Sequence, residues 1–177
     1  GAFALYLSGG SISALSGGSL PTADGYIASV AINQNGAGII GGTNSVTGEA
    51  YAALVPAGGG TLQHLSGGSL PSDGNIYFVA INNAGYGIVG GNDNATNFGY
   101  AALVVPGSTM LQNLANADFP STGEIYSVAI NQAGQGIIGG HNDTFIYAAF
   151  VYPDGTLETI PGAFPAGTIN SVAISEE

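Results

Sequence analysis

The sequence contains no lysine or arginine, so its 11 aspartate and glutamate residues are the only ionised side chains and give a formal net charge of −11. Nucleic acid requires cationic side chains that displace the counterions of the phosphate backbone, and an anionic membrane surface attracts basic patches. The composition therefore excludes nucleic acid as a partner. It also predicts a protein that stays dissolved near neutral pH and associates as the pH falls toward its pI of about 4.1.

Cysteine and tryptophan are absent too. Without cysteine there are no disulfides, no thiolate metal sites and no cysteine nucleophile, so packing has to stabilise the fold. No apolar run approaches the roughly 18 residues that span a bilayer, which argues against membrane insertion. The chain starts Gly1-Ala2-Phe3, with no methionine, basic segment or cleavage site. Because trypsin cuts only after lysine and arginine, a protease-trimmed fragment of a longer chain is one explanation of this composition.

Glycine is abundant, with 31 residues, and proline contributes 8 of the 177. Together they fall short of the roughly 25–30% typical of low-complexity disorder. The 45% of hydrophobic residues suffice for a core. A Val-Ala-Ile-Asn segment recurs at spacings of 49, 49 and 44 residues, with Ser in place of Asn in the last copy. A fixed period of this length decides the fold class. The valines of these segments are Val30, Val79, Val128 and Val172.

Each complete repeat contains four short apolar runs bounded by Gly, Pro, Asn and Asp, a pattern typical of strands separated by turns. The turn between the first two runs has the form Asn-x-x-Gly-x-Gly, in which Asn33 is expected to cap its own turn and Gly36 to take a left-handed conformation. The continuous apolar runs predict strands packed on both faces. A small residue inside the first run lets neighbouring sheets approach closely. In the four copies this residue is Ala31, Ala80, Ala129 and Ala173, respectively.

These features predict an all-β fold: a β-propeller of about four 49-residue blades, each a four-stranded antiparallel sheet with the Val-Ala-Ile-Asn strand innermost. The repeats fall approximately at 1–26, 27–75, 76–124, 125–167 and 168–177. The first supplies strands three and four of a blade and the last a lone inner strand at 168–174, so the closing blade lacks its second strand. Residues 1–177 then form a single propeller domain with one short blade, a fragment of a larger propeller, or one of several copies that complete a ring.

Two other repeat architectures fit less well. The coils of a parallel β-helix are shorter and lack tight antiparallel hairpins of this kind. The strands of an outer-membrane barrel are about 10 residues long and carry aromatic girdles. The runs in this sequence match neither description, which leaves the propeller as the predicted architecture.

The order of the motifs resembles the extracellular HAF-type repeats of bacteria. Those repeats pair an Ala-x-Ala-Ile-Asn-x-x-Gly-x-x-x-Gly core with an Ala-Phe segment and a Gly-x-Leu-x-x-Leu segment. The nearest match in this chain is Ala148–Tyr152 followed by Asp154–Ile160. The strand order is also similar to that of WD-type propellers, although the Trp-Asp signature is absent. The resemblance implies a secreted or cell-surface bacterial protein, as in autotransporter passenger regions, and it assigns no functional residues.

Propellers usually bind ligands at the loops that lead into the inner strand and at those that join the second and third strands. Aromatic residues at the start of the inner strands are expected near the channel mouth, or packed between blades. They are Tyr26, Tyr77 and Tyr126. Polar residues of the joining loops complete the predicted ligand face. They are Asn92, Asp93, His141 and Asp143.

Three residues of these loops are weak candidates for calcium ligands, because Ca²⁺ takes roughly six to eight oxygen ligands. They are Asp93, Asn94 and Asp143. The alternative is that Asn and Asp form turns there without a metal. No cofactor is expected to be essential to the fold.

The spacing offers no Ser, His and Asp constellation for a hydrolase, and the arginines of a sialidase-type propeller are absent. We therefore expect no enzyme, but a secreted or surface-displayed module that binds a protein or glycan through its loop face, as in adhesion. The alternatives are a structural unit that self-associates through its sheet edges, and a lectin. The absence of tryptophan and arginine, as side chains on which a sugar would bind, counts against the lectin.

Overall fold

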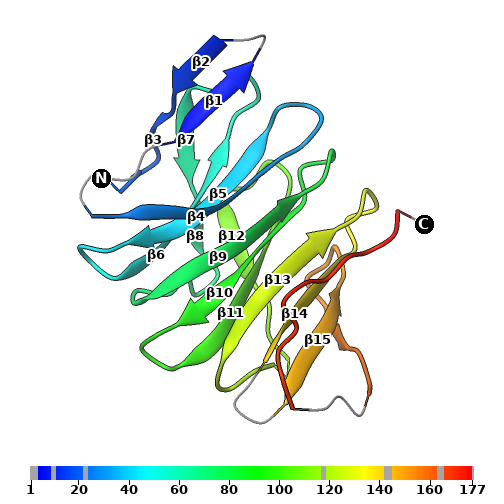
Figure 1. Ribbon diagram of the computed structural model, residues 1–177. Helices are drawn as coiled ribbons and strands as arrows, with labels where there is room; N and C mark the ends of the chain where they lie inside the picture. Colours follow the sequence, from blue (N-terminus) through cyan, green and yellow to red (C-terminus); the bar gives the residue numbers. More distant parts are fainter. Residues whose placement is uncertain are drawn as a thin grey trace.

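The computed structural model describes residues 4–8, 11–21, 24–116, 119–141, 145–162 and 166–176. Within these ranges the fold consists of 16 strands and contains no helix (Figure 1). The predicted all-β class is therefore confirmed. No helix in the described ranges is long and apolar enough to cross a membrane.

The strands are short, and turns rich in glycine, proline and asparagine separate them, as the sequence predicts. In chain order they are β1 Leu5–Ser8, β2 Ser11–Ala14, β3 Ser16–Gly17, β4 Tyr26–Ile32, β5 Gly38–Asn44, β6 Glu49–Val55, β7 Thr61–His64, β8 Ser66–Gly67, β9 Gly74–Ile81, β10 Gly87–Asp93, β11 Phe98–Val104, β12 Met110–Asn113, β13 Glu124–Ile130, β14 Gly136–His141, β15 Ile146–Val151 and β16 Leu157–Thr159.

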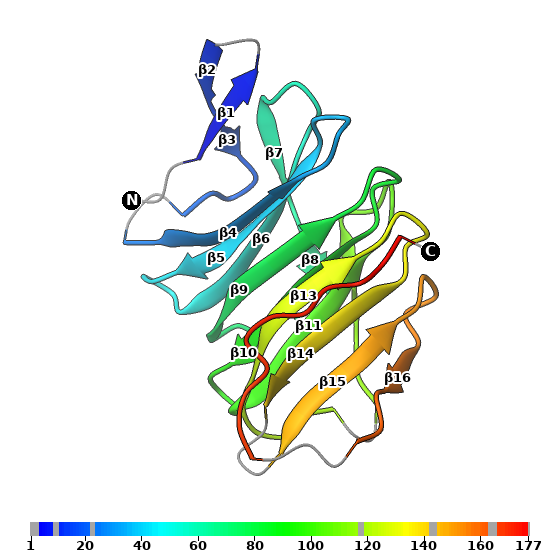
Figure 2. The ribbon, with the colours of Figure 1, turned by 45° about the vertical axis from the view of Figure 1, so that its right-hand side comes forward.

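These strands form three large sheets and one hairpin (Figure 2). Sheet 1 has the order β3-β7-β6-β5-β4, sheet 2 the order β8-β12-β11-β10-β9, and sheet 3 the order β13-β14-β15-β16. Within each sheet, four strands pair antiparallel in chain order, so the first strand of every repeat lies at a sheet edge.

Sheets 1 and 2 differ from the predicted four strands, because each has a fifth. The fifth strand is the short link β3 or β8, which follows the fourth strand of the preceding unit. It pairs in parallel with the fourth strand of the next sheet, β7 or β12. The link runs beside that outer strand before the chain turns inward, which the linear repeat pattern does not reveal.

The turn between the first and second strands of a repeat also joins neighbouring sheets. In sheet 2, Asn82 Oδ1 accepts a hydrogen bond from Tyr86 N at 3.0 Å, and the first glycine of the turn has a φ of +89°. The predicted asparagine cap and left-handed glycine are confirmed. The amide nitrogen of the same asparagine reaches the next sheet. Asn33 Nδ2 donates to Asn82 O at 2.9 Å, Asn82 Nδ2 to Asn131 O at 2.9 Å, and Asn131 Nδ2 to Ser175 O at 3.1 Å.

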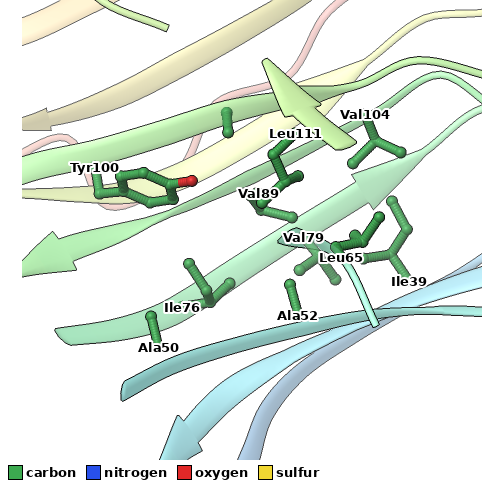
Figure 3. Packing of buried hydrophobic residues seen from close by; sticks show 11 residues of the cluster. Ile39, Ala50, Ala52, Leu65, Ile76, Val79, Val89, Tyr100, Val104 and Leu111 are labelled. Carbon is green, nitrogen blue, oxygen red and sulfur yellow. The ribbon is translucent and has the colours of Figure 1, made fainter. Parts of the chain in front are cut away.

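Buried side chains fill the interfaces between sheets (Figure 3). Between sheets 1 and 2, Ala50 and Ala52 of β6 meet Ile76 and Val79 of β9, so small residues on one sheet face larger ones on the next. A second cluster joins sheets 2 and 3, and a third joins the β1–β2 hairpin to sheet 1. The second and third strands of sheets 1 and 2 are buried on both faces, as predicted.

The double glycine in each second strand meets two different neighbours. A Cβ atom on Gly41 would lie 2.4 Å from Cγ2 of Ile76 and 2.8 Å from Cγ1 of Val79, so this glycine lets the next sheet approach. A Cβ atom on Gly42 would lie 2.0 Å from the carbonyl oxygen of Tyr26, beside the irregular pairing of β4. The same pair recurs at Gly90, Gly91, Gly139 and Gly140.

The first strand of sheet 1 departs from the predicted two-sided burial. In β4 the exposed and half-buried residues alternate, and Val30 and Ile32 are 68% and 61% exposed. Ala31 is half-buried, packed against the cluster between sheets 1 and 2. The prediction fails for β4 because no described segment covers its outer face, whereas the equivalent Val79 in β9 is covered by sheet 1.

The β1–β2 hairpin and residues 168–176 lie at opposite ends of the row of sheets (Figure 2). The β1–β2 hairpin matches the predicted third and fourth strands of a partial repeat. The inner strand predicted at 168–174 is not a strand, because no described segment pairs with it along its length. It nevertheless follows sheet 3 in the place of a first strand: Ile169 N donates to Gly140 O at 3.4 Å, and Val172 N donates to Ser127 Oγ at 3.1 Å. Across the described residues the row of sheets stays open.

Candidate functional site

The two sets of variable loops meet at one end of the sheets, which we call the loop end. Residues 45–48 and 94–97 join the second and third strands of sheets 1 and 2, and residues 71–73 and 121–123 lead into sheets 2 and 3. Backbone hydrogen bonds tie one set to the other: Gly74 N to Gly48 O at 2.8 Å, Asn94 N to Asp73 O at 2.8 Å, and Gly123 N to Asn97 O at 2.9 Å. The loops predicted to form one face therefore do lie together.

The first and second strands end at the loop end with three facing pairs of residues. These pairs are Tyr26 with Thr43, Asn75 with Asn92, and Glu124 with His141. Tyr26 thus stands at the position of Asn75 and Glu124 in the later repeats. Tyr77 and Tyr126 share a different position, two residues further along their strands. The three tyrosines are therefore neighbours at the loop end. They do not share one repeated position, which corrects the prediction from the sequence pattern.

A chain of side-chain hydrogen bonds crosses the loop end from sheet to sheet. Asn75 Oδ1 accepts from the Tyr26 hydroxyl at 3.0 Å and from the Thr43 hydroxyl at 2.5 Å. Asn75 Nδ2 donates to Asn92 Oδ1 at 3.1 Å, and Asn92 Nδ2 donates to Glu124 Oε1 at 3.5 Å. Connected networks of this kind hold polar side chains in fixed orientations. The loop end therefore presents an ordered polar surface.

The Glu124 carboxylate contributes to a raised pKa of two tyrosines beside it. A hydrogen bond with the Glu124 carboxylate, together with burial and the charge of that carboxylate, raises the pKa of Tyr126 to about 12. Burial raises the pKa of Tyr77, and the charges of Glu124 and Tyr26 add to this rise, whereas a hydrogen bond with Asn75 opposes it. Both phenols keep their protons at neutral pH and are available as hydrogen-bond donors.

A polar cavity of about 400 Å³ opens beside this network. The rings of Tyr126 and His141 lie 5.3 Å apart, centroid to centroid, on its wall. Nδ1 of His141 is buried and has no hydrogen-bond partner among the residues described. The lining combines one carboxylate with amide, hydroxyl and aromatic groups. It consists of Asn92, Thr96, Asn97, Thr122, Gly123, Glu124, Tyr126 and His141.

The calcium candidates are engaged within their own loops. Asp93 Oδ1 accepts a hydrogen bond from Ala95 N at 2.9 Å, which is the pattern of an Asx turn. Asn94 accepts from Asn92 Nδ2 at 2.7 Å and donates its own amide to Asp73 Oδ1 at 3.0 Å. Asp143 lies outside the described residues. Within the described ranges no three His, Cys, Asp or Glu side chains gather as metal ligands would, and these contacts favour the turn interpretation.

The structure brings together Asn92, Tyr126 and His141 from the predicted ligand face. Asp93 instead turns into its own loop. Asn75 and Glu124 are outside the predicted face, yet they connect the network and the cavity. The signal that reveals them is the repeat itself, because the position held by Tyr26 recurs as Asn75 and then Glu124 at the start of strands that share the Val-Ala-Ile-Asn motif.

The described strands form an open row of three sheets packed face to face, each with four antiparallel strands in chain order and the first strand at one edge, and this all-β arrangement is similar to that of a propeller. Among solved structures, the chain is similar to the propeller of Dos1, with a TM-score of 0.55 and 14% sequence identity. The alignment covers 76% of this chain and 36% of that chain, so this chain spans about a third of the length of that propeller. At this identity the likeness shows the fold alone.

No protein-family model matches the chain. No curated protein sequence matches it either. The β-propeller character of the fold is supported by the Dos1 structure, whereas the likeness to HAF-type repeats and the bacterial origin that it implies stay predictions.

Proposed function

We propose that this protein is a non-enzymatic binding module that holds a neutral, hydroxyl-rich ligand, such as a surface glycan, at the loop end. The observation that carries the proposal is the grouping of Glu124, Tyr126 and His141 around one polar cavity. Carboxylate, amide and hydroxyl groups bind sugar hydroxyls, and an aromatic ring covers the apolar face of a sugar. A propeller fold is consistent with a binding or assembly module.

The charge of the chain supports a neutral ligand over an anionic one. The sequence has no lysine or arginine and a formal net charge of −11, so an anionic ligand would approach a repulsive surface and meet no strong cation. Sialylated and sulfated glycans are therefore disfavoured. A protein surface rich in lysine and arginine is the other partner that this charge suits.

The residues of the cavity support binding without catalysis. A glycosidase of the usual kind needs two carboxyl groups roughly 5–9.5 Å apart on either side of the scissile bond. Glu124 is the single carboxylate among the described residues that line this cavity. This lining supports binding over catalysis.

The proposal includes secretion or surface display, with adhesion as the biological role. Its support is the resemblance of the repeats to extracellular bacterial ones. Structural assembly is the second candidate function, and the exposed apolar residues Leu7, Ile12, Val30 and Ile32 favour it.

A glycan array of neutral, sialylated and sulfated glycans tests the proposal directly. We expect binding to neutral glycans, lost in Tyr126→Ala and weakened at least severalfold in Glu124→Gln. Glu49→Gln is the matched control, because Glu49 lies at the same end but outside the cavity, with its carboxylate bonded to Thr47. Binding that survives Tyr126→Ala, or that depends equally on Glu49, would contradict the proposal.

A further inference from the structure

The end of the molecule that carries the N-terminal hairpin is apolar. A groove of about 570 Å³ runs between β1 of the hairpin and strands β4 and β5 of sheet 1. Leu7 and Val30, which line it, are each 68% exposed, and Ile32 is 61% exposed. Soluble proteins rarely expose contiguous apolar surface of this kind unless it binds a partner. We call this surface the N-terminal groove.

The repeat shows what such a surface contacts elsewhere in the molecule. Leu7 stands at the position of Val55 in sheet 1 and Val104 in sheet 2, because Leu7 pairs with Ile12 as Val104 pairs with Leu111. Val55 and Leu62 are both buried against the preceding hairpin, whereas Leu7 and Ile12 are exposed. Val30 likewise stands at the position of the buried Val79. Val30 therefore exposes one half of an inter-sheet interface that repeats twice within the chain, and Leu7 exposes the outer face of the adjoining hairpin.

The opposite end of the row presents the matching half. Residues 168–176, which we call the tail segment, lie against sheet 3 in the place of a first strand. No second strand pairs with them among the described residues. A Cβ atom on Gly139 would lie 2.6 Å from Ile169 and 2.7 Å from Val172, just as Gly41 meets Ile76 and Val79. Ser127 Oγ accepts from Val172 N at 3.1 Å, as Ser29 Oγ accepts from Val79 N at 3.2 Å. The tail segment thus has the place and contacts of an inner strand.

The outward side of the tail segment is exposed. Ser171 and Ala173 occupy the positions of Ser29 and Ala31 in sheet 1. Ser29 and Ala31 contact the next sheet, through the bond to Val79 N and through packing on the shared cluster. Ser171 and Ala173 have no next sheet to contact among the described residues, and both are exposed.

We propose that the N-terminal groove binds the tail segment of a second copy of this chain. Ser171 and Ala173 of one copy then face Val30 and Ile32 of the other, and the tail segment takes the place of a first strand beside the β1–β2 hairpin, in a composite sheet without a second strand. Two such junctions close a symmetric dimer. Each copy contributes three sheets and shares two composite ones, which gives a ring of eight sheets, within the roughly four to eight blades usual for propellers.

The mass of the 177-residue chain in solution, measured by light scattering over a dilution series, tests the dimer. We expect a dimer at high concentration that dissociates on dilution, and a monomer for Val30→Asp at every concentration. Val46→Asp is the matched control, because Val46 is also an exposed valine, at 63%, but lies in a loop of the loop end. A monomeric wild-type chain, or a Val30→Asp variant that still dimerises, would overturn the proposal.

A mixing experiment tests the head-to-tail arrangement. Ala173→Asp disables the tail segment and leaves the groove intact, whereas Val30→Asp does the reverse. Each variant alone is expected to be monomeric, and an equimolar mixture is expected to form dimers through its one intact junction. A dimeric Ala173→Asp variant would point to groove-to-groove contact and would overturn the proposal, as would a mixture that stays monomeric. Circular dichroism that matches the wild type shows that both variants are folded.

Discussion

At the scale of single residues, the distance between sheets is set by glycines in the second strands. Gly41, Gly90 and Gly139 each face an isoleucine and a valine of the following first strand. Any side chain there would push the sheets apart, because close-packed interiors transmit such strain. Glycines of the second strands therefore keep the sheets close, and Ala31 of the first strand packs against the same interface.

We expect Gly41→Ala to destabilise the fold by about 1–3 kcal/mol, the usual cost of overpacking a core. Its Cβ would lie 2.4 Å from Ile76, closer than any relaxed contact. Gly99→Ala is the control, because a Cβ there would lie 3.4 Å from Pro120, an ordinary contact. Urea unfolding of both variants measures the difference. Equal midpoints for the two variants would show that the sheets can separate freely at Gly41.

The second residue-scale prediction concerns the titration of Tyr126. Its pKa in the folded protein is raised to about 12, chiefly by the hydrogen bond with Glu124. A raised pKa favours the protonated phenol, so this contribution to stability is full below the ordinary tyrosine pKa of about 10 and is lost as the pH rises toward 12. Glu124→Gln removes the carboxylate, and we expect the Tyr126 pKa to fall toward its ordinary value.

Tyrosinate absorbance followed against pH, with Tyr126→Phe to identify the contribution of this residue, measures that shift. Glu158→Gln is the control, since Glu158 contacts Tyr152 in sheet 3 and not the loop end. An unchanged Tyr126 titration in Glu124→Gln would mean that burial alone holds the proton.

Residue roles were predictable where a single position determines them. The asparagine cap and the left-handed glycine of the Asn-x-x-Gly-x-Gly turn follow from local backbone geometry and are confirmed. The donation from Asn33 Nδ2 to Asn82 O depends on a residue 49 positions away, and local chemistry does not indicate it. Glu124 escaped prediction for the same reason, since its partners come from sheet 2 and from its own strand.

At the scale of elements, the first strand of each repeat contributes both to its own sheet and to the contact with the preceding sheet. It pairs with its own second strand along one edge, and its side chains fill the interface with the preceding sheet. Such an element has two kinds of neighbour, a second strand along its edge and a preceding sheet on its face. Among the described residues β4 lacks the neighbour on its face, at the exposed Val30, and the tail segment lacks the second strand.

The β1–β2 hairpin shows how an element with few neighbours is held. The Tyr6 hydroxyl donates to Gly36 O at 3.3 Å and accepts from Gly58 N at 3.2 Å, which links the hairpin to two turns of sheet 1. We expect Tyr6→Phe to lower the free energy of local opening of the hairpin by about 0.5–1.5 kcal/mol, a typical hydrogen-bond contribution. Hydrogen exchange of β1 and β2 then accelerates severalfold in the monomer while β10 and β11 keep their protection.

Tyr152→Phe is the control for this measurement, because it removes a tyrosine hydroxyl from sheet 3, whose partner is Glu158. Slow exchange of β1 and β2 in Tyr6→Phe would show that apolar packing of the ring against the Leu15 cluster suffices to hold the hairpin.

The sequence predicted the four antiparallel strands of each repeat, because alternation of apolar runs and turns is a local signal. It did not predict the fifth strands β3 and β8, since their partners β7 and β12 lie more than 40 residues further along the chain. It placed an inner strand at 168–174, where the residues have the strand's pattern but lack the pairing that makes a strand.

At the scale of the whole molecule, the three sheets form an open row with two unlike ends. The similar Dos1 propeller is about three times as long as the aligned part of this chain, which agrees with a row that covers only part of a ring. One end exposes Leu7 and Val30, and the other exposes Ser171 and Ala173. The loop end runs along the side of this row, so the proposed ligand binding and the proposed association would use different surfaces.

The charge of the chain should make the proposed dimerisation and the proposed glycan binding respond differently to salt. Each copy carries a net charge of −11 and no lysine or arginine, so two copies repel each other while apolar surface draws them together. Raising the ionic strength from about 0.01 M to about 0.15 M shortens the screening length roughly fourfold. We therefore expect the dimer to tighten as salt is added, and to tighten again as the pH falls toward the pI of about 4.1. Binding of a neutral glycan should change little over the same salt range, because the ligand carries no charge. Sedimentation at several salt concentrations measures the change in dimerisation, and calorimetry with an array-selected glycan measures the change in glycan affinity. A dimer that weakens with salt would require charge pairing between copies, for which this sequence supplies no basic side chains other than its 2 histidines.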